Sequence, residues 1–381
     1  MRILVAPNAF KGSLTADEAA KAIVSGFEGS SLQATYILFP VGDGGTGTGG
    51  LLANHFSAKQ ISIEVFDPLK RLIKASYGVI DEGKTAIIDV SSASGIHLLQ
   101  HADLDPFSTT SFGVGQLIFD ALNQNIRKFI IGVGGTSTVD GGAGILQALG
   151  AQFYDVSGRR LENIPQELHA VDHVDLSNLD ERILESEVIL LCDVENPLFG
   201  HEGGIRMFSG QKGASIEQIG VLERNLANFS ELLCPGSRGS LSHMKYSGAA
   251  GGISGGLYLS LQAKLVSGID YFLEVTECMQ VLQQVDAVVT GEGSIDKQTL
   301  RGKAPYGVAK LAKSMGLPVI ALTGIRPVEI SQELNKYFDA IFAIGSGPGA
   351  LEIAMSQTAV NLYGTAKQMG NLLSSKNNTN V

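Results

Sequence analysis

Short glycine-rich segments that carry carboxylates, lysines or hydroxyls recur along this chain, each directly after a run of apolar residues typical of a buried strand. Glycine supplies 47 of the 381 residues, which is about 12% where roughly 7% is usual. A glycine loop lets backbone N–H groups approach a ligand closely, and the helix that follows adds partial positive charge. Loops of this kind suit the binding of phosphate.

The same loops hold acidic and basic side chains. In chain order they read PNAFKGSLT, PVGDGGTGTGG, GVGGTSTVDGGAG, CDVENPLFG, SGQKGAS and TGEGSIDKQTLRGKAP. Carboxylates beside a phosphate site would repel the ligand unless Mg²⁺ lies between them, and lysines there can neutralise a phosphoryl group in transfer. A single glycine turn often marks only close packing. Six of them predict a nucleotide–Mg²⁺ site.

Five carboxylates and three lysines stand in these loops: Asp43, Asp140, Asp193, Glu292, Asp296, Lys11, Lys212 and Lys303. Asp140 and Asp296 also fit the role of helix N-caps, since each precedes an expected helix. Arg71 lies outside the loops and is either a surface charge or a group that reaches a substrate carboxylate.

The elements that must position these residues follow from the apolar pattern. Runs rich in β-branched residues without polar alternation are typical of strands covered on both faces, and we expect them at residues 2–6, 35–39, 128–133, 188–193, 286–290, 318–323 and 339–344. Amphipathic stretches predict helices at residues 15–27, 111–122, 298–313 and 351–373. This alternation indicates an α/β fold with parallel sheets, which bind ligands beyond the carboxyl ends of their strands.

One region has a different pattern. Between residues 60 and 90, three strand-like runs follow one another, and the last two are separated by DEGK, a hairpin signal. We therefore expect a doubly wound parallel-sheet domain formed by residues 1–60 and 285–381, interrupted by an inserted α+β domain of residues 61–284. The cleft between two such domains is the default place for an active site.

Composition excludes several classes of protein. Hydrophobic residues make up 44% and charged residues 17%, so the chain is not intrinsically disordered. A net charge of −10 argues against nucleic acid as a partner. Neither a signal peptide nor a membrane-spanning run is evident, so we expect a cytoplasmic protein without membrane contact. Its oligomeric state stays open, a homo-oligomer included.

Standard motifs leave one rival interpretation. There is no GxxxxGK[ST] P-loop and no protein-kinase or GxSxG signature. The GxGxxG pattern occurs in residues 42–47, with Glu64 about 20 residues further on, as in dinucleotide-binding proteins. An NAD-dependent oxidoreductase is therefore an alternative, although Asp43 stands where a pyrophosphate would pass.

Seven motifs in order resemble the bacterial glycerate kinase family: APNAFKGSLTADEAA, PVGDGGTGT, IGVGGTSTVDGGAG, DVENPLFG, GQKGA, GAAGG and GEGSIDKQTLRGKAP. The resemblance covers residues 1 to about 369. It implies transfer of a phosphoryl group from ATP to D-glycerate with Mg²⁺, at the 2-hydroxyl to give 2-phosphoglycerate. It also implies one Rossmann-like domain, one inserted domain and an active site between them. A non-catalytic sugar-acid sensor is a further alternative.

Within this hypothesis each candidate has a role. Asp193 orients the acceptor hydroxyl or takes its proton, and Asp296 is the second candidate for that role. Lys212 is the third candidate catalytic residue and would bind phosphate or the glycerate carboxylate. Asp43 and Glu292 bind Mg²⁺ directly or through water. The expected phosphate- or substrate-binding residues are Lys11, Arg71, Gly134, Gly135, Thr136, Ser137, Asp140 and Lys303. The chain departs from the family pattern at Asn8, Ala9, Thr46, Val139 and Gly210.

Overall fold

The computed structural model describes residues 1–296, 299–345, 347 and 349–377. The chain divides into two compact units. The terminal unit consists of Met1–Asp43 and Ile269–Val381, and the inserted unit consists of Gly44–Gly268. We expected the divisions after residues 60 and 284. They fall earlier in the chain because α2 (Thr48–His55) packs on the inserted sheet, whereas Phe272 packs on Phe39 of the terminal unit.

The terminal unit is built on a five-stranded sheet in the order β13-β12-β11-β1-β2. All four neighbouring pairs are parallel, so the five carboxyl ends lie at one edge. The strands are β1 (Arg2–Pro7), β2 (Thr35–Leu38), β11 (Ala287–Ser294), β12 (Val319–Ile325) and β13 (Ala340–Ala343). The helices are α1 (Ala16–Glu28), α12 (Gly268–Val275), α13 (Cys278–Leu282), α14 (Ala304–Ser314), α15 (Gln332–Asn335), α16 (Leu351–Ser356) and α17 (Thr358–Asn377).

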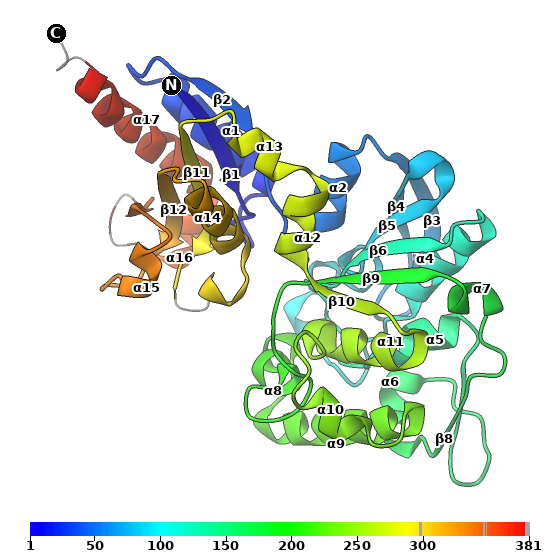
Figure 1. Ribbon diagram of the computed structural model, residues 1–381. Helices are drawn as coiled ribbons and strands as arrows, with labels where there is room; N and C mark the ends of the chain where they lie inside the picture. Colours follow the sequence, from blue (N-terminus) through cyan, green and yellow to red (C-terminus); the bar gives the residue numbers. More distant parts are fainter. Residues whose placement is uncertain (297–298, 346, 348, 378–381) are drawn as a thin grey trace. The chain divides into compact units, whose positions relative to one another are not determined.

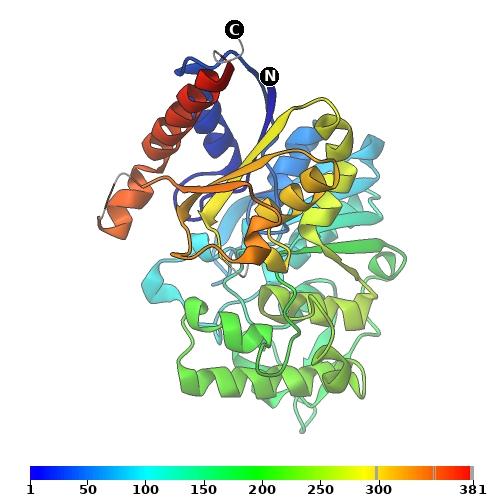
Figure 2. The ribbon, with the colours of Figure 1, turned by 60° about the vertical axis from the view of Figure 1, so that its left-hand side comes forward.

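Helices cover both faces of this sheet. Helix α1 begins at a capping box formed by Thr15 and Glu18, and its apolar face lies against β1 and α17. Both ribbon views show α17 beside α1 (Figures 1 and 2). The apolar residues of β1, α1 and α17 form one buried cluster. Helix α14 packs on β1 and β11 with apolar residues that do not belong to this cluster, as expected for a doubly wound sheet.

The inserted unit is built on a six-stranded mixed sheet in the order β10-β9-β6-β5-β4-β3. Its strands are β3 (Lys59–Phe66), β4 (Leu72–Ile80), β5 (Thr85–Asp89), β6 (Lys128–Gly132), β9 (Glu187–Cys192) and β10 (Lys264–Ser267). Strands β5, β6, β9 and β10 are parallel, whereas β4 is antiparallel to both β3 and β5. The three strands expected between residues 60 and 90 and the hairpin expected between the last two are confirmed. A separate two-stranded sheet pairs β7 (Gln152–Tyr154) with β8 (His173–Asp175).

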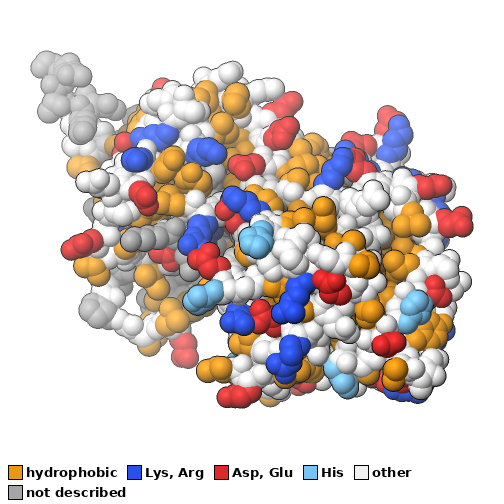
Figure 3. Space-filling view, turned by 60° about the horizontal axis from the view of Figure 1, so that its bottom comes forward, with side chains coloured by type: hydrophobic (Ala, Val, Ile, Leu, Met, Phe, Trp, Pro, Cys, Tyr) orange, Lys and Arg blue, Asp and Glu red, His pale blue; other side chains and the backbone are white. Residues whose placement is uncertain are grey.

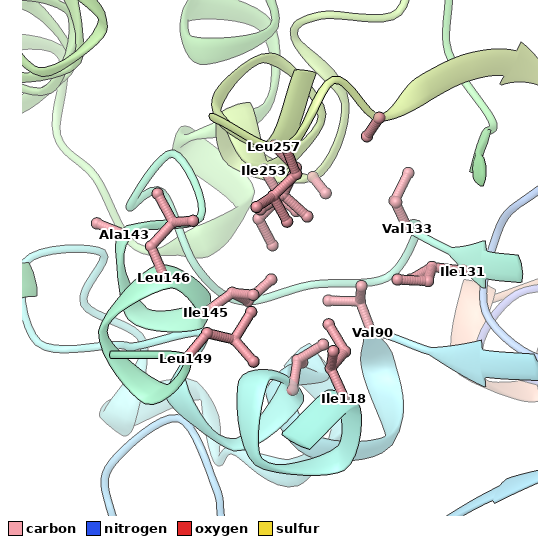
Figure 4. Packing of buried hydrophobic residues seen from close by; sticks show 14 of the residues in the cluster. Val90, Ile118, Ile131, Val133, Ala143, Ile145, Leu146, Leu149, Ile253 and Leu257 are labelled. Atoms are coloured by element: carbon pink, nitrogen blue, oxygen red, sulfur yellow. The ribbon is translucent and has the colours of Figure 1, made fainter. Parts of the chain in front are cut away.

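Helices and sheet of the inserted unit enclose a large apolar core. Ile131 of β6 belongs to one cluster with Ile118, Ile145 and Ile253, which come from three helices (Figure 4). The helices of this unit are α2, α3 (Ser91–Ser94), α4 (Phe112–Asn123), α5 (Ala143–Ala148), α6 (Ile164–Glu167), α7 (Glu181–Leu184), α8 (Gly204–Phe208), α9 (Ile216–Leu233), α10 (Ser237–Leu241) and α11 (Ile253–Leu261).

The expected fold class is confirmed, with two α/β units of which one interrupts the other. Two expected helices need correction. The helix expected at residues 298–313 begins at Ala304, where Lys303 is extended and a proline follows in the first turn; Gln298 lies outside the described residues. The helix expected at residues 351–373 is divided at Gln357, because α16 ends there and the Thr358 hydroxyl bonds back to its last carbonyls. Among the described residues, no helix has both the length and the apolarity to span a membrane.

Candidate active site

The carboxyl edge of the inserted sheet gathers candidates from distant parts of the chain. Strands β5, β6 and β9 end side by side at Asp89, Gly132 and Cys192, and Asp193 follows directly. Strand β3 is parallel to β5 through β4, so the β3–β4 turn with Arg71 lies at the same edge. The topology therefore brings the polar residues expected in this unit to one edge.

Lys212 is a buried ammonium group. It lies in a short 3₁₀ turn (Gly210–Lys212), and the residue is only 3% exposed. Its Nζ donates to the carbonyl of Thr138 at 2.9 Å. Burial lowers the pKa of Lys212 to about 8, against the opposing effect of the Asp193 and Asp140 carboxylates. A lysine held this way serves as a fixed positive charge beside Asp193.

Asp193 lies against a glycine that makes room for it. A Cβ added to Gly134 would stand 2.8 Å from Oδ2 of Asp193 and 2.5 Å from Cα of Gly45. Any side chain at position 134 would therefore collide with both. The glycine expected to cradle phosphate thus also lets the backbone approach the leading candidate for the catalytic group.

The hydroxyls of the segment after Gly134 are already engaged. Ser137 and Thr136 are buried; the Ser137 hydroxyl donates to the carbonyl of Ser94, and Thr136 Oγ1 shares a hydrogen bond with Thr138 Oγ1. The amides of Gly134 and Ser137 bond to carbonyls within the unit. Within the described part of the chain, the amides of Gly135 and Thr136 make no hydrogen bond. These two amides, rather than the hydroxyls, are the donors left for a phosphate.

Asp140 has the position of a helix cap. Its buried carboxylate accepts hydrogen bonds from the amide and hydroxyl of Ser111 and from the amides of Gly142 and Gly144. It therefore joins the start of α4 to the start of α5. Helix α11 packs close to this loop, with Gly256 against the carbonyl of Gly141.

Arg71 is half-exposed and engaged in several contacts. Its Nε pairs with Asp67 at 2.6 Å, one terminal nitrogen donates to the carbonyl of Leu98, and the other lies 3.8 Å from Asp103. The guanidinium group thus holds the β3–β4 turn.

In the terminal unit, Asp43 is 5% exposed and its carboxylate joins two elements. Its Oδ2 accepts a hydrogen bond from Nδ2 of Asn8 at 2.9 Å, directly after β1, and from the amide of Ala304 at 3.4 Å, at the start of α14. An acid is favoured here by the partial positive charge of the helix N-terminus.

Glu292 is buried at the end of β11 among charged partners. Its Oε1 accepts from the hydroxyl of Thr299 at 3.0 Å, and its Oε2 lies 3.7 Å from Nζ of Lys303. Burial raises the pKa of Glu292 to about 7; Asp43 raises it further, whereas Lys303 and Lys11 oppose the rise. The terminal unit therefore gathers two carboxylates and two lysines.

Asp296 makes reciprocal hydrogen bonds with a neighbour. Its Oδ1 accepts from the amide of Thr299 at 3.3 Å, and its own amide donates to the Thr299 hydroxyl at 3.1 Å. This is the N-cap interpretation that the sequence also allowed. Among the described residues, no group of three or more His, Cys, Asp or Glu side chains is arranged to hold a metal ion.

Sequence reasoning missed three residues of these clusters. Asn8 appeared only as a departure from a family pattern, and Thr299 carried no signal of its own. Asp89 accepts hydrogen bonds from the amides of Gly49 and Gly50, and burial raises its pKa to about 6. Its signal was available, since it follows a buried strand as Asp193 does.

Comparisons with known proteins show which family this chain belongs to. The model of the glycerate kinase family matches residues 3–374. The chain belongs to the glycerate kinase family. Its curated relatives include the glycerate kinase of Bacillus subtilis, 39% identical over 97% of each chain, and the glycerate 2-kinase of Escherichia coli, 37% identical over 93% of each chain. A crystal structure of a protein assigned as glycerate kinase 2 from Salmonella typhimurium LT2 superposes with a TM-score of 0.79 at 35% identity, covering 99% of both chains.

In this member of the glycerate kinase family, the GxGxxG segment is not part of a dinucleotide fold. The strand before it, β2, belongs to the terminal unit, whereas the helix after it, α2, belongs to the inserted unit. The first turn of α2 receives the Asp89 carboxylate, which occupies the place of a pyrophosphate. Glu64 lies exposed in the edge strand β3 opposite Lys74.

The surface of this glycerate kinase family member carries charges of both signs. On the face shown in Figure 3, Lys and Arg side chains lie among Asp and Glu side chains rather than in one continuous basic area.

Proposed function

We propose that this chain transfers the γ-phosphoryl group of ATP to the 2-hydroxyl of D-glycerate and releases 2-phosphoglycerate. The observation that carries the proposal is the family match over residues 3–374. The two clusters supply what phosphoryl transfer needs, because this reaction requires positioning and charge neutralisation rather than covalent chemistry.

The terminal unit is the proposed place for Mg²⁺ and phosphate. A nucleotide-bound Mg²⁺ uses one or two protein carboxylates, together with phosphate oxygens and water. Asp43 and Glu292 fit this requirement, since both are buried carboxylates and each feels the charge of the other. Mg²⁺ supplies neutralisation of phosphate charge when it is bound. Lys11 and Lys303 add two positive charges beside these acids.

The inserted unit is the proposed place for the acceptor. Asp193 orients the glycerate hydroxyl and takes its proton as the new phosphorus–oxygen bond forms and the bond between the γ-phosphorus and the leaving ADP oxygen breaks. Lys212 places a buried positive charge beside Asp193, since the two groups interact electrostatically. The amides of Gly135 and Thr136 donate to phosphate, while Ser137, Asp140 and Arg71 hold the surrounding segments. Asp296 is the second candidate for the proton acceptor.

A coupled assay tests this proposal. The protein is incubated with ATP, Mg²⁺ and D-glycerate, with enolase alone in one arm and with phosphoglycerate mutase plus enolase in the other. Phosphoenolpyruvate with enolase alone is expected, because enolase consumes 2-phosphoglycerate directly. Product that requires the mutase would assign the 3-hydroxyl instead. An absence of ATP consumption in both arms would reject glycerate as the acceptor.

A further inference from the structure

Asp89 caps a helix from a distant part of the chain. It ends β5, its Oδ1 accepts the amide of Gly49 at 2.9 Å, and its Oδ2 accepts the amide of Gly50 at 3.3 Å. These amides belong to the first turns of α2, whose own N-cap residue is Gly47 and provides no side chain. Gly49 and Asp89 are 40 positions apart in the sequence.

Two glycines on different elements leave room for this carboxylate because they have no side chain. A Cβ on Gly49 would stand 2.9 Å from Cγ of Asp89, and one on Gly132 would stand 2.6 Å from its Oδ1. Neither position tolerates a side chain while Asp89 keeps its place. Gly50, the next residue of the helix, has open space where a Cβ would be.

The segment before α2 connects Asp89 to the proposed catalytic group. The carbonyl of Gly44 accepts the amide of Gly134 at 2.8 Å, and Thr46 packs directly on Gly135. Gly134 in turn lies against Asp193, as described above. Any shift of the first turn of α2 therefore reaches the backbone on which Asp193 rests.

We propose that Asp89 is a positioning residue, which holds the first turn of α2 and thereby keeps residues 44–47 packed against the backbone beside Asp193. This inference rests on the proposed role of Asp193 in phosphoryl transfer. A misplacement of about 1 Å at the reacting groups can reduce a rate by about 10²-fold. Asp89 itself touches no substrate.

The charge state of Asp89 matters to this arrangement. Each carboxylate oxygen accepts one amide, so both oxygens must be acceptors. Asparagine has one acceptor oxygen and would turn an NH₂ group toward one of the two amides. Burial raises the pKa of Asp89 to about 6 and the two amides oppose this rise, which shows that the hydrogen bonds stabilise the ionised form.

The first test replaces the carboxylate. In D89N we expect kcat to fall by about 10- to 100-fold, while the KM values for ATP and D-glycerate change by less than about 3-fold. Hydrogen–deuterium exchange of residues 44–55 is expected to accelerate. The matched control is D180N, since Asp180 accepts the amide of Arg182 at the start of α7, ahead of the amino end of β9. This control is expected to leave kcat and the exchange of residues 44–55 unchanged.

The second test keeps the carboxylate but places a methyl group in the volume that it occupies. G49A places a methyl group against Asp89, whereas G50A places one in solvent on the same helix. Alanine favours the helix at both positions. We expect G49A to reproduce the lower kcat and faster exchange of D89N, and G50A to retain normal kcat with equal or slower exchange. This pair decides the matter even if D89N does not fold.

Two results would overturn the inference. Faster exchange of residues 44–55 with normal kcat would mean that their order is not needed for the reaction. A lower kcat with unchanged exchange would mean that Asp89 acts by another route. If the wild-type protein consumes no ATP with glycerate, the proposed function fails, and the exchange data still decide whether Asp89 holds the segment.

Discussion

In the terminal unit a buried glutamate lies among lysines, whereas in the inserted unit a buried lysine lies among carboxylates. Burial raises the pKa of Glu292 to about 7 and lowers the pKa of Lys212 to about 8. In both places the neighbouring opposite charges counteract the shift without cancelling it. Removal from water therefore outweighs charge pairing at both sheet edges, since each pKa lies nearer to neutral pH than its usual value.

The two edges also differ in how they are held in place. Glu292 and Asp43 accept from the neutral side chains of Thr299 and Asn8, and they also have Lys303 and the start of α14 as partners. Lys212 donates to the carbonyl of Thr138, in a segment whose buried hydroxyls bond to other groups of the same unit. Glycines such as Gly134 then allow backbone segments to touch. We therefore expect the terminal unit to neutralise the charge of the phosphate and the inserted unit to place the reacting groups precisely.

The largest effect is expected for Asp193→Asn. Loss of a group that takes or orients a proton costs about 10²- to 10⁴-fold, so kcat should fall by that factor. The side chain is only partly buried at the end of β9, so the urea unfolding midpoint should change little. Steady-state kinetics and urea titration measure both. Normal turnover in this variant would remove Asp193 from the mechanism and leave Asp296 as the remaining candidate.

A smaller effect is expected for Glu292→Gln. Removing one proposed Mg²⁺ ligand should raise the Mg²⁺ concentration for half-maximal activity by at least about 10-fold. Replacing a residue that only supports a metal ligand already lowers metal affinity by about that factor. Thr299→Val is the control, because it deletes only the hydroxyl that bonds to Glu292 and Asp296. Its Mg²⁺ requirement should change less. An unaltered Mg²⁺ requirement in Glu292→Gln would contradict the metal role.

The third prediction is a stability effect and uses Lys212→Met, a variant in which loss of the charge beside Asp193 should also lower kcat. The folded-state pKa of Lys212 is about 8 against a usual value of 10.5. Between these two pH values the unfolded chain binds more protons than the folded chain. The contribution of Lys212 to the free energy of unfolding is therefore lowest below pH 8 and rises toward pH 10.5. The shift corresponds to about 3 kcal/mol. Urea unfolding between pH 7 and 10.5 should show this rise in the wild type relative to the variant; parallel curves would mean that Lys212 titrates normally.

The sequence was informative where signals are local. Apolar runs located the strands of the terminal sheet and all but β10 of the six-stranded inserted sheet, whereas β7 and β8 were not expected. Thr15 and Glu18 marked the start of α1, and DEGK marked the turn between β4 and β5. Seven ordered motifs identified the family, which the family match confirms. These features depend on residues that are neighbours in the chain, so a single sequence carries them.

Long-range partners were not available from the sequence. The expectation that the backbone of residues 134–137 holds a phosphate took no account of the carbonyls of Gly44 and Ser94, which accept the amides of Gly134 and Ser137 in the folded unit. Asp89 was overlooked because its two donors belong to a helix 40 positions earlier in the chain. The roles of the individual site residues stay predictions until the variants are measured.

The pairing of β1 with β11 has a consequence for folding order. Arg2 and Asp286, at the start of this pairing, are 284 positions apart, and every strand of the inserted unit lies between them in the sequence. On a ribosome, the inserted sheet is complete in the nascent chain before β11 has been made. The first strands of the terminal unit must then remain unpaired with β11 during that time, with their apolar residues uncovered. A chain truncated before β11 would therefore leave β1 and β2 prone to aggregation, while the inserted unit could still fold.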